Sequence, residues 1–418
     1  MRIIYLHQYY NNPDMSGGTR SYEMARRMVS AGHEVHMITS VREEKPQATG
    51  WFTTNDAGIN VHWYPVPYSN HMNHFQRIAA FFSFAIAAKK KAASLSADVI
   101  FATSTPLTIA IPAVLTARKK EIPMVFEVRD LWPEMPIAVG ALRNPVLKYV
   151  AKKLERWAYF NSSAVVALSP GMKEGVARTG YPFKRIAVIP NSCDIQEFAG
   201  GRGGAGEFRS ERPWLGQHPL LIYAGALGRV NGVGYAVELA SELNKINSNV
   251  RILVVGSGAE REKIIAEARR AQVYNQNIYF EPAMSKKDMP KLFGAATMAS
   301  SLVIDLPEAR ANSANKFFDA LAAGKPVFIN HGGWMHDLIL SHGCGLTVWR
   351  KPIETVARQL HENLNDDVWL ESSAYLAKKI AAEYFSRDIL AAQLIAVLEA
   401  AVNKNPEIVS DIAPGTYC

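Results

Sequence analysis

Apolar residues follow two patterns that alternate along this chain. Short, nearly continuous apolar runs are typical of strands that are buried on both faces of a parallel sheet. Longer stretches carry apolar residues at helical spacing, as Tyr22, Ala25, Met28 and Val29 do within 19–31. The strand-like runs span 2–6, 34–39, 59–65, 98–102, 124–128, 164–169, 186–190, 220–224, 250–255, 278–280, 297–303 and 327–329.

Helical stretches separate these runs. They span 19–31, 73–95, 107–119, 144–158, 171–179, a stretch ending near 243, 261–271, 285–293, 315–323 and 384–402. A strand, a helix and a second strand in this order form a right-handed βαβ unit. Two successive series of such units predict an α/β fold with two doubly wound, Rossmann-like domains facing each other across a cleft. A chain of 418 residues is long enough for both.

The order of the elements also predicts domain boundaries. We expect a first domain over 1–188 and a second over 189–383. The helix at 384–402 is expected to pack back on the first domain, and 403–418 to form a loose tail. The stretch 200–211, rich in glycine and arginine, predicts a mobile loop.

The most informative stretch is 312–329. Asn312 and Ser313 are residue types that cap helices, and they precede the helix predicted at 315–323. Lys316 and Asp319 are three residues apart, so they share one face of that helix. Amide N–H groups and a lysine suit a pyrophosphate, and a carboxylate suits ribose hydroxyls. The alternative is a capped helix whose Lys–Asp pair is a solvated ion pair.

Two further stretches predict ligand contacts at strand ends. Gly17 and Gly18 precede the first predicted helix, where they let a backbone approach a ligand, although G-x-G-x-x-G is absent. Arg129 and Asp130 follow the strand at 124–128, at the end of a parallel strand where such sheets bind ligands. Arg129 and Asp130 could equally anchor a loop.

The positive charge of the chain lies in its first half. The net charge is +8, and residues 1–190 hold 23 lysines and arginines against 13 acidic residues, whereas 191–418 hold 23 against 25. This asymmetry predicts an anionic partner: a membrane surface, a phosphate-bearing substrate or a nucleic acid. Nucleic acid is the weakest of the three, because no basic–aromatic stacking platform is present.

The predicted helix at 73–95 suggests which anionic surface is involved. It carries Phe81, Phe82 and Phe84 and ends in the lysines of 89–91, as a helix lying in a membrane interface would. The alternative is a core helix of an α/β layer with a basic end. No apolar run is long enough to span a bilayer, the N-terminus does not resemble a signal peptide, and three isolated cysteines suit a reducing compartment. A cytoplasmic, peripheral protein is expected.

Five motifs taken in order resemble the retaining glycosyltransferases of the GT-B fold, family 4. They are Gly17-Gly18 followed by 32–35, then 189–191, 223–225, 255–258 and 319–327. The resemblance covers nearly the whole chain. Within the family, the runs 126–134 and 312–326 are most similar to bacterial O-antigen and capsule enzymes that transfer N-acetyl-L-fucosamine.

The resemblance implies roles for particular residues. Lys316, joined by Arg229, would contact the pyrophosphate of a UDP-sugar donor, and Asp319 the ribose. The other implied donor contacts are Gly17, Gly18, Gly256, Met284 in the base-holding segment 281–284, and the backbone of Asn312, Ser313 and Asn315. Arg129 and Asp130 occupy the neighbourhood of the usual catalytic histidine.

The chain departs from the family pattern at three places. The first of the two usual glutamates falls at Ala311, and Glu308 is the candidate substitute. Two usual basic residues are replaced by Ala226 and Asn231, which leaves Arg229 displaced. Recognition of the donor sugar is the function that these departures affect.

The resemblance also implies a reaction. A sugar would pass, with retention and without a metal or other cofactor, to a polyprenyl-diphosphate-linked sugar at the inner leaflet of the membrane. No D-x-D cation site is evident in the sequence. Two alternatives stay open: a GT-B-fold nucleotide-sugar epimerase, and a non-catalytic GT-B partner subunit.

Overall fold

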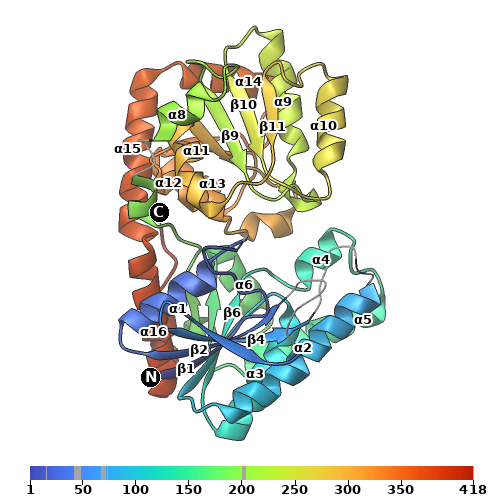
Figure 1. The fold of residues 1–418 in the computed structure, drawn as a ribbon, viewed down its shortest axis with the longest axis vertical. Coiled ribbons are helices and arrows are strands. Elements are labelled where there is room, and N and C mark those ends of the chain that lie inside the picture. The colour runs from blue at the N-terminus through green and yellow to red at the C-terminus, as the bar shows by residue number, and fades with distance from the viewer. Residues whose placement is uncertain (16, 42–48, 67–71, 73, 200–203, 418) are drawn as a thin grey trace. The chain divides into compact units, whose positions relative to one another are not determined.

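The computed structural model describes residues 1–15, 17–41, 49–66, 72, 74–199 and 204–417. Within these ranges the chain divides into two compact units (Figure 1). Unit 1 comprises residues 1–190 and 387–416, and unit 2 comprises 191–386 with Tyr417. The chain therefore leaves unit 1 after Pro190 and re-enters it at Arg387.

Unit 1 is built on an eight-stranded sheet. Its strands, in spatial order, are β3 (Phe52–Asp56), β4 (Ile59–Pro65), β2 (Glu34–Val41), β1 (Arg2–Leu6), β5 (Val99–Thr103), β6 (Met124–Val128), β7 (Ala164–Ala167) and β8 (Ile186–Val188). All neighbours are parallel except β3 and β4, which form an antiparallel hairpin absent from the prediction. The central strands are buried on both faces, as their continuous apolar runs predict.

Helices cover both faces of this sheet (Figure 1). On one face, α1 (Arg20–Ser30) and α16 (Arg387–Val402) share a core with β1, β2 and β5. On the other, α2 (His74–Ser94) and α3 (Ala110–Lys120) pack on β2 and β5, and α5 (Pro145–Phe160) packs on α3. The shorter helices are α4 (Glu134–Ala138), α6 (Pro170–Arg178), α17 (Val409–Ile412) and the 3₁₀ turns η1 (Leu107–Ile109), η2 (Phe183–Arg185) and η7 (Pro406–Ile408).

Unit 2 has a six-stranded, wholly parallel sheet. The order is β11 (Ile278–Glu281), β10 (Arg251–Val255), β9 (Leu220–Ala224), β12 (Met298–Ser301), β13 (Val327–Ile329) and β14 (Gly345–Thr347). One face packs on α9 (Gly234–Lys245), α10 (Arg261–Arg270) and α14 (Ile353–Leu364). The other packs on α7 (Ile195–Ala199), α8 (Ala205–Ser210), α11 (Met289–Ala295), α12 (Asn315–Ala322), α13 (Trp334–His342) and α15 (Asp367–Tyr384).

The prediction of a loose tail over 403–418 is wrong. Residues 406–412 form η7 and α17, and Val409 is fully buried. The Val188 amide donates to the Ala413 carbonyl at 2.8 Å, and Lys173 Nζ donates to Ser410 Oγ at 2.7 Å. These partners lie more than 200 positions away in the sequence, so no local pattern reveals them.

The predicted mobile loop over 200–211 is wrong for the part that the structure describes, since 200–203 lie outside it. Residues 205–210 form α8, whose Phe208 is buried. Arg209 donates from Nη2 to the Ala295 carbonyl at 2.8 Å, which ties α8 to the end of α11. The break between α15 and α16, at 385–386, also falls just inside the single helix predicted over 384–402.

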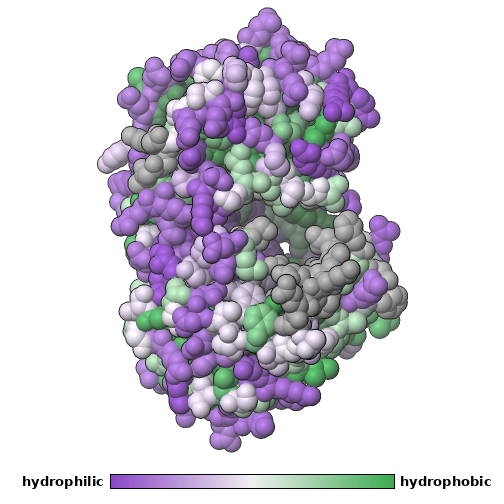
Figure 2. All heavy atoms as spheres, in the orientation of Figure 1, coloured by the Kyte–Doolittle hydropathy of each residue, from purple (hydrophilic) through white to green (hydrophobic). Residues whose placement is uncertain are grey.

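Helix α2 has the predicted extent, although Asn73 lies outside the described residues. Phe84 is buried, so it cannot contact a membrane, whereas Phe82 is exposed. Across the described residues, no helix is both long and apolar enough to cross a bilayer. On the face drawn in Figure 2, hydrophilic residues predominate on both units.

Candidate functional site

Each sheet has a point where the direction of its connections reverses. In unit 2 this switch point lies between β9 and β12, and in unit 1 between β1 and β5. Loops that follow two such strands diverge to opposite faces of the sheet, so a crevice opens at their carboxyl ends, where ligands bind in this kind of fold. The residues at the carboxyl ends of these four strands and of their neighbours in each sheet therefore define the candidate sites.

Glycine backbone lines the switch point of unit 2. Gly225 follows β9, and Gly256 follows β10. A Cβ atom on Gly256 would lie 1.9 Å from the Gly225 carbonyl oxygen, and one on Gly225 would lie 3.3 Å from Lys316 Cε. Only glycine permits this approach of two loops and a lysine side chain. The surface is thus mostly backbone, with Lys316 beside it.

Lys316 is the cation of this site. It lies in the first turn of α12, half-buried, with Nζ 3.0 Å from Tyr223 Oη and 4.3 Å from the centre of the Tyr223 ring. Burial lowers the pKa of the Lys316 ammonium to about 8. The same burial raises the pKa of the Tyr223 phenol above its ordinary value, so the hydroxyl is neutral and donates to the Ala226 carbonyl. A neutral phenol solvates the ammonium without cancelling its charge.

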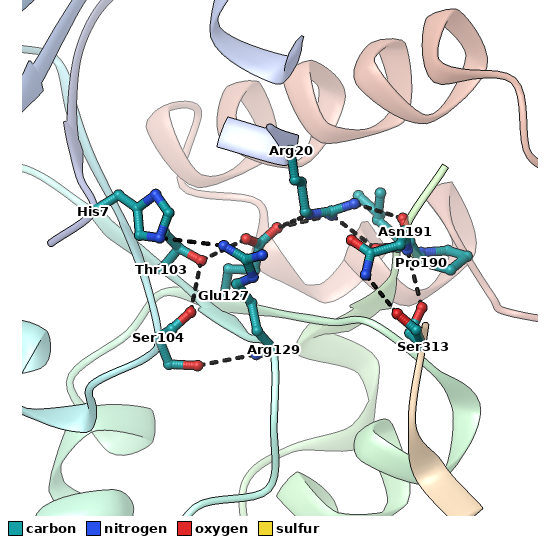
Figure 3. Close-up of polar contacts among 10 residues, drawn as sticks. His7, Arg20, Thr103, Ser104, Glu127, Arg129, Pro190, Asn191 and Ser313 are labelled. Atoms are coloured by element: carbon teal, nitrogen blue, oxygen red, sulfur yellow. Dashed lines mark hydrogen bonds and ion pairs between the residues drawn. The ribbon is translucent and has the colours of Figure 1, made fainter. Parts of the chain in front are cut away.

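The predicted capping of α12 by Asn312 and Ser313 is wrong. The N-cap is Ala314, with no side-chain cap. Ser313 Oγ accepts from the Asn191 amide at 3.0 Å (Figure 3), and Asn312 Nδ2 donates to the Ala309 carbonyl. Because neither side chain reaches the first turn, neither satisfies the amides that begin α12, which is the end of a helix that attracts anions.

Other predicted residues of unit 2 lie on elements around this switch point. Asp319 is half-buried one turn after Lys316, and Asn315 is exposed at the start of α12. Arg229 is exposed in the 3₁₀ turn η4 (Arg229–Asn231), and half-buried Met284 follows β11.

Glu308 lies on the 3₁₀ helix η6 (Pro307–Ala311), half-buried. Ala311 ends the same helix. Side chains three residues apart eclipse in a 3₁₀ helix, so the two positions share one face.

Two functional candidates of unit 2 were missed at the sequence level. Tyr223 lies within the motif at 223–225, but nothing in the sequence indicates its contact with Lys316. His331 follows β13, is almost fully buried, and has its Nδ1 2.9 Å from the Gly332 carbonyl. Its Nε2 has no hydrogen-bond partner within the described parts of the chain. Burial lowers the pKa of the His331 imidazole, so the ring is neutral at physiological pH.

The switch point of unit 1 holds a buried ion pair (Figure 3). Arg20, in the first turn of α1, donates to Glu127 Oε1 from Nε at 3.0 Å and from Nη2 at 2.8 Å. Thr103 Oγ1 donates to Glu127 Oε2 at 2.6 Å. Burial acts to raise the pKa of the Glu127 carboxyl, but the Arg20 charge and these hydrogen bonds outweigh it and hold the pKa below its ordinary value.

Arg20 also holds the segment where the chain leaves unit 1. Its Nη1 donates to the Pro190 carbonyl at 2.6 Å and its Nη2 to the Ile189 carbonyl at 2.9 Å. Four hydrogen bonds from Arg20 therefore serve a carboxylate and two carbonyls, which only a guanidinium can do at once. Pairing of this kind marks a structural centre, and no local pattern in the sequence indicates a partner for Glu127.

Arg129 and Asp130 follow β6 beside this pair. The Arg129 amide donates to Ser104 Oγ at 3.0 Å, and its Nη1 lies 3.2 Å from His7 Nε2 (Figure 3). Asp130 is exposed. The arrangement joins the loops after β1, β5 and β6, which fits the loop-anchoring alternative for Arg129.

Gly17 and Gly18 lie in the loop before α1. Gly17 has a φ of +126°, and Asn11 Nδ2 donates to the Gly18 carbonyl at 3.4 Å. A side chain at Gly17 would be strained and would meet the Asn11 amide at 2.6 Å.

The two switch points therefore offer different chemistry. Unit 2 presents an under-neutralised ammonium, a helix N-terminus and a surface of backbone, a combination that binds a phosphate group. Unit 1 presents a neutralised ion pair with an arginine–histidine contact beside it. Phosphate binding is the chemistry that unit 2 supports best.

The chain matches two known domain families. Residues 17–192 match the "Glycosyl transferase 4-like domain", and residues 206–382 match the "Glycosyl transferases group 1". The uncharacterized glycosyltransferase MJ1607 of Methanocaldococcus jannaschii is 23% identical over 60% of this chain and 63% of its own length. The alpha-D-kanosaminyltransferase of Streptomyces kanamyceticus is 22% identical over 59% and 63%. The chain thus matches less than two thirds of either relative's length.

Solved structures share the fold at low sequence identity. The sucrose-phosphate synthase of Thermosynechococcus elongatus superposes with a TM-score of 0.75 and 16% identity, over 95% of this chain and 98% of that one. Anabaena HepE in complex with UDP-glucose has a TM-score of 0.69 and 16% identity, over 96% and 100%. The chain therefore belongs to the GT-B glycosyltransferases, with a glycosyl transferase 4-like domain followed by a group 1 domain.

Proposed function

We propose that this protein transfers a sugar from a UDP-sugar to a polyprenyl-diphosphate-linked sugar acceptor, with retention of the anomeric configuration. The observation that carries the proposal is Lys316: a half-buried ammonium at a switch point, which, among the residues that the structure describes, is paired only with the Tyr223 phenol. A buried cation without an anion is costly, and a bound diphosphate removes that cost. The base is assigned as uracil because the similar HepE binds UDP-glucose.

Departure of the nucleotide is the step that needs most help. As the glycosidic bond breaks, negative charge grows on the leaving diphosphate. We assign the stabilisation of that charge to Lys316 and to the amides at the start of α12, which no side chain caps, and Arg229 on η4 would join them. Because these groups would stabilise the leaving diphosphate, we propose that the reaction is independent of a metal ion.

Recognition of the ribose and the base is assigned to two segments. Asp319, one turn after Lys316 on α12, would accept from the ribose hydroxyls, and the segment 281–284 would hold the base. Arg212 holds Glu281 with two hydrogen bonds, at 2.7 and 2.9 Å, so Glu281 positions the segment and leaves the base contact to residues up to Met284.

Recognition of the donor sugar is assigned to Glu308. Glu308 and Ala311 share one face of η6. The Glu308 carboxylate can therefore contact the sugar from the same side as a glutamate at position 311 would. Arg310 holds η6 in place, since Nη2 donates to Asp305 at 2.9 Å and the guanidinium stacks 4.8 Å from the Trp349 ring. The sugar that we propose is N-acetyl-L-fucosamine or a related deoxy-amino sugar, and the setting is synthesis of O-antigen or capsule.

The test measures transfer and binding in the same preparations. Purified wild type and the Lys316→Ala variant are assayed with a panel of UDP-sugars, and UDP affinity is measured by calorimetry. Lys316→Ala should lower turnover by ~10²-fold or more. Lys325→Ala is the matched control, because Lys325 lies past the other end of α12 and donates to the Gly294 carbonyl at 3.0 Å. Equal turnover in wild type and Lys316→Ala would contradict the proposal.

The same assay separates the two rival functions. Product analysis with donor alone would reveal an epimerised nucleotide sugar if the protein were an epimerase. Tight UDP binding without hydrolysis of, or transfer from, any donor would identify a non-catalytic partner subunit. Ala311, in place of the usual glutamate, is the observation that keeps the second rival in view.

A further inference from the structure

Helix α5 of unit 1 exposes large apolar side chains on its outward side. Its outward side chains include Val146, Leu147, Tyr149 and Val150, which are 66%, 47%, 62% and 54% exposed. Its inward side chains are Ala151, Glu155, Ala158 and Tyr159, all buried. A helix that packs on a domain and faces water carries polar residues on its outward side. The outer face of α5 is therefore built for a surrounding less polar than water.

Apolar residues form a stripe along one side of α5, which Lys153 interrupts. Val146, Tyr149, Val150, Trp157 and Phe160 follow the spacing that places side chains along one side of a helix. Phe160 is 47% exposed at the far end, and Trp157 is half-buried between. The stripe thus extends from the first to the last turn of α5, a helix that lies at the periphery of unit 1 (Figure 1).

Cations border this stripe and no exposed carboxylate opposes them on the helix. Lys152, Lys153 and Arg156 are exposed, and Lys148 is half-buried. The sole acidic residue of α5 is Glu155, which is buried and accepts from Tyr159 Oη at 3.2 Å. Burial raises the pKa of the Glu155 carboxyl to about 7, which further reduces its negative charge.

The cations lie against the rings of the same face. Lys153 Nζ is 5.4 Å from the centre of the Tyr149 ring, and the Arg156 guanidinium is 4.6 Å from that of Phe160. Their stems thus run along the apolar stripe with the charges at its edge, which is how basic side chains reach phosphate headgroups above an apolar layer.

The start of α5 is held firmly although it is exposed. Asn144 Oδ1 accepts from the amides of Val146 at 2.9 Å and Leu147 at 3.2 Å, and Pro145 occupies the first turn. A capped start with a proline does not fray. The apolar side chains are therefore presented on a preformed helix.

The neighbouring helix α2 adds to the same layer of unit 1. Both α2 and α5 pack on α3. On α2, Phe82 and Ile86 are 47% and 59% exposed, and Lys89 and Lys90 are exposed one turn further on. Two helices of one layer thus combine exposed apolar side chains with lysines.

We propose that the outer face of α5 lies on an anionic lipid bilayer, with its apolar stripe at the level of the acyl chains and its cations at the phosphate groups. Charge complementarity selects this occupant, because the face offers positive charge and apolar area together. A second copy of the chain on a two-fold axis would instead set the lysines of one α5 against those of the other. This proposal extends the proposed function, since it assigns the contact with the membrane to the outer face of α5. It does not depend on which donor or acceptor the protein uses.

The test is flotation of the full chain with vesicles, without nucleotide or acceptor. Wild type should float with vesicles of phosphatidylcholine and phosphatidylglycerol and stay behind with phosphatidylcholine alone. Val150→Glu should reduce the floated fraction by about tenfold, since it places a carboxylate in the apolar stripe. Val368→Glu is the matched control, because Val368 on α15 of unit 2 is 79% exposed and lies outside the stripe.

Each outcome of this experiment decides the matter. Lys152→Glu with Lys153→Glu should abolish the preference for anionic vesicles, and near-normal UDP binding by every variant shows that the chain is folded. Equal flotation of wild type and Val150→Glu would overturn the proposal, as would flotation of neither. A dimer that becomes a monomer in Val150→Glu would assign the face to a second copy. Loss of sugar transfer in Lys316→Ala leaves flotation unchanged, so the two proposals fail separately.

Discussion

The two switch points of this molecule treat buried charge in opposite ways. In unit 1, Arg20 and Glu127 neutralise each other at 2.8 Å, with side chains only 2% and 0% exposed, and carbonyls and a threonine take up the remaining hydrogen bonds. In unit 2, Lys316 hydrogen-bonds only to the Tyr223 hydroxyl within the part of the chain that the structure describes. A paired buried charge stabilises a fold, whereas an under-neutralised one awaits a counter-ion.

This difference teaches how to tell a structural centre from a binding site in a doubly wound domain. Position alone does not, because both groups lie at the carboxyl ends of central strands. Whether the buried charge has an oppositely charged partner does distinguish them. In unit 1, Arg20 and Glu127 join α1, β6 and the chain at Pro190. In unit 2, Lys316 lies at the start of α12 without a carboxylate partner among the described residues.

The largest expected effect comes from breaking the pair in unit 1. Glu127→Gln leaves the Arg20 charge buried without a partner, and should lower the free energy of unfolding by about 3–5 kcal/mol. Chemical denaturation measures it. Asp98→Asn is the control, since its partner Arg2 is 48% exposed and the loss should be slight. Equal losses in the two variants would show that the buried pair has no special role.

The same pair predicts sensitivity to acid. The folded-state pKa of Glu127 lies below its ordinary value, so the unfolded chain binds the proton more readily. The stabilisation is therefore complete at neutral pH and is lost as pH falls through the folded pKa. Denaturation curves of wild type and Glu127→Gln should converge at low pH. Curves that stay parallel down to the acid limit would contradict this assignment.

In unit 2 the expected change of stability has the opposite sign. Lys316→Met removes a cation whose burial is uncompensated, so the ligand-free protein should gain about 1–3 kcal/mol while donor binding is lost. Thermal unfolding with and without UDP measures both quantities. A loss of stability in Lys316→Met would show that Tyr223 already compensates the charge.

Affinity for UDP should also depend on pH. Because the pKa of Lys316 in the free protein is about 8, its charge disappears above that pH, and UDP affinity should fall by up to about tenfold per pH unit. Below pH 8 the ammonium is already charged, so affinity should be level from about pH 7 to 8 once the diphosphate is fully ionised. Calorimetry across this range tests it, with Lys316→Arg as the control that stays charged. The same decline in both proteins would place the titrating group elsewhere.

The smallest effect is expected at Tyr223. Tyr223→Phe removes the hydroxyl that solvates Lys316 but keeps the ring beneath it, so UDP affinity should change by only about two- to fivefold. Titration calorimetry measures it. A loss as large as that of Lys316→Ala would make the phenol itself a ligand contact.

The sequence predicted the α/β fold well because its information is local. Buried parallel strands need continuous apolar runs, and such runs predict most of the strands that the structure describes. They do not predict the antiparallel β3, because Phe52–Asp56 is polar and mostly exposed, nor β14, because Gly345–Thr347 holds a single large apolar residue. The tail at 403–418 failed for the opposite reason, since its order depends on Val188 and Lys173, far away in the chain.

The candidate site was predictable only in part, for the same reason. Lys316 could be placed at a helix start from its neighbours in sequence. Its partner Tyr223 is 93 positions away, and the partners of Glu127 are 107 and 24 positions away. The neighbours of Ser313 in the sequence predict a capping role for it. In the structure its hydroxyl instead accepts a hydrogen bond from the amide of Asn191, 122 positions away.

The central claim is that Lys316 binds the diphosphate of a nucleotide. Its most direct test is calorimetric titration of wild type and Lys316→Ala with UDP and with UMP. Wild type should bind UDP at least tenfold more tightly than UMP, and Lys316→Ala should bind the two nearly equally, since only the terminal phosphate is lost between them. If Lys316→Ala kept the full preference of wild type for UDP, the diphosphate would lie elsewhere and the account would be wrong.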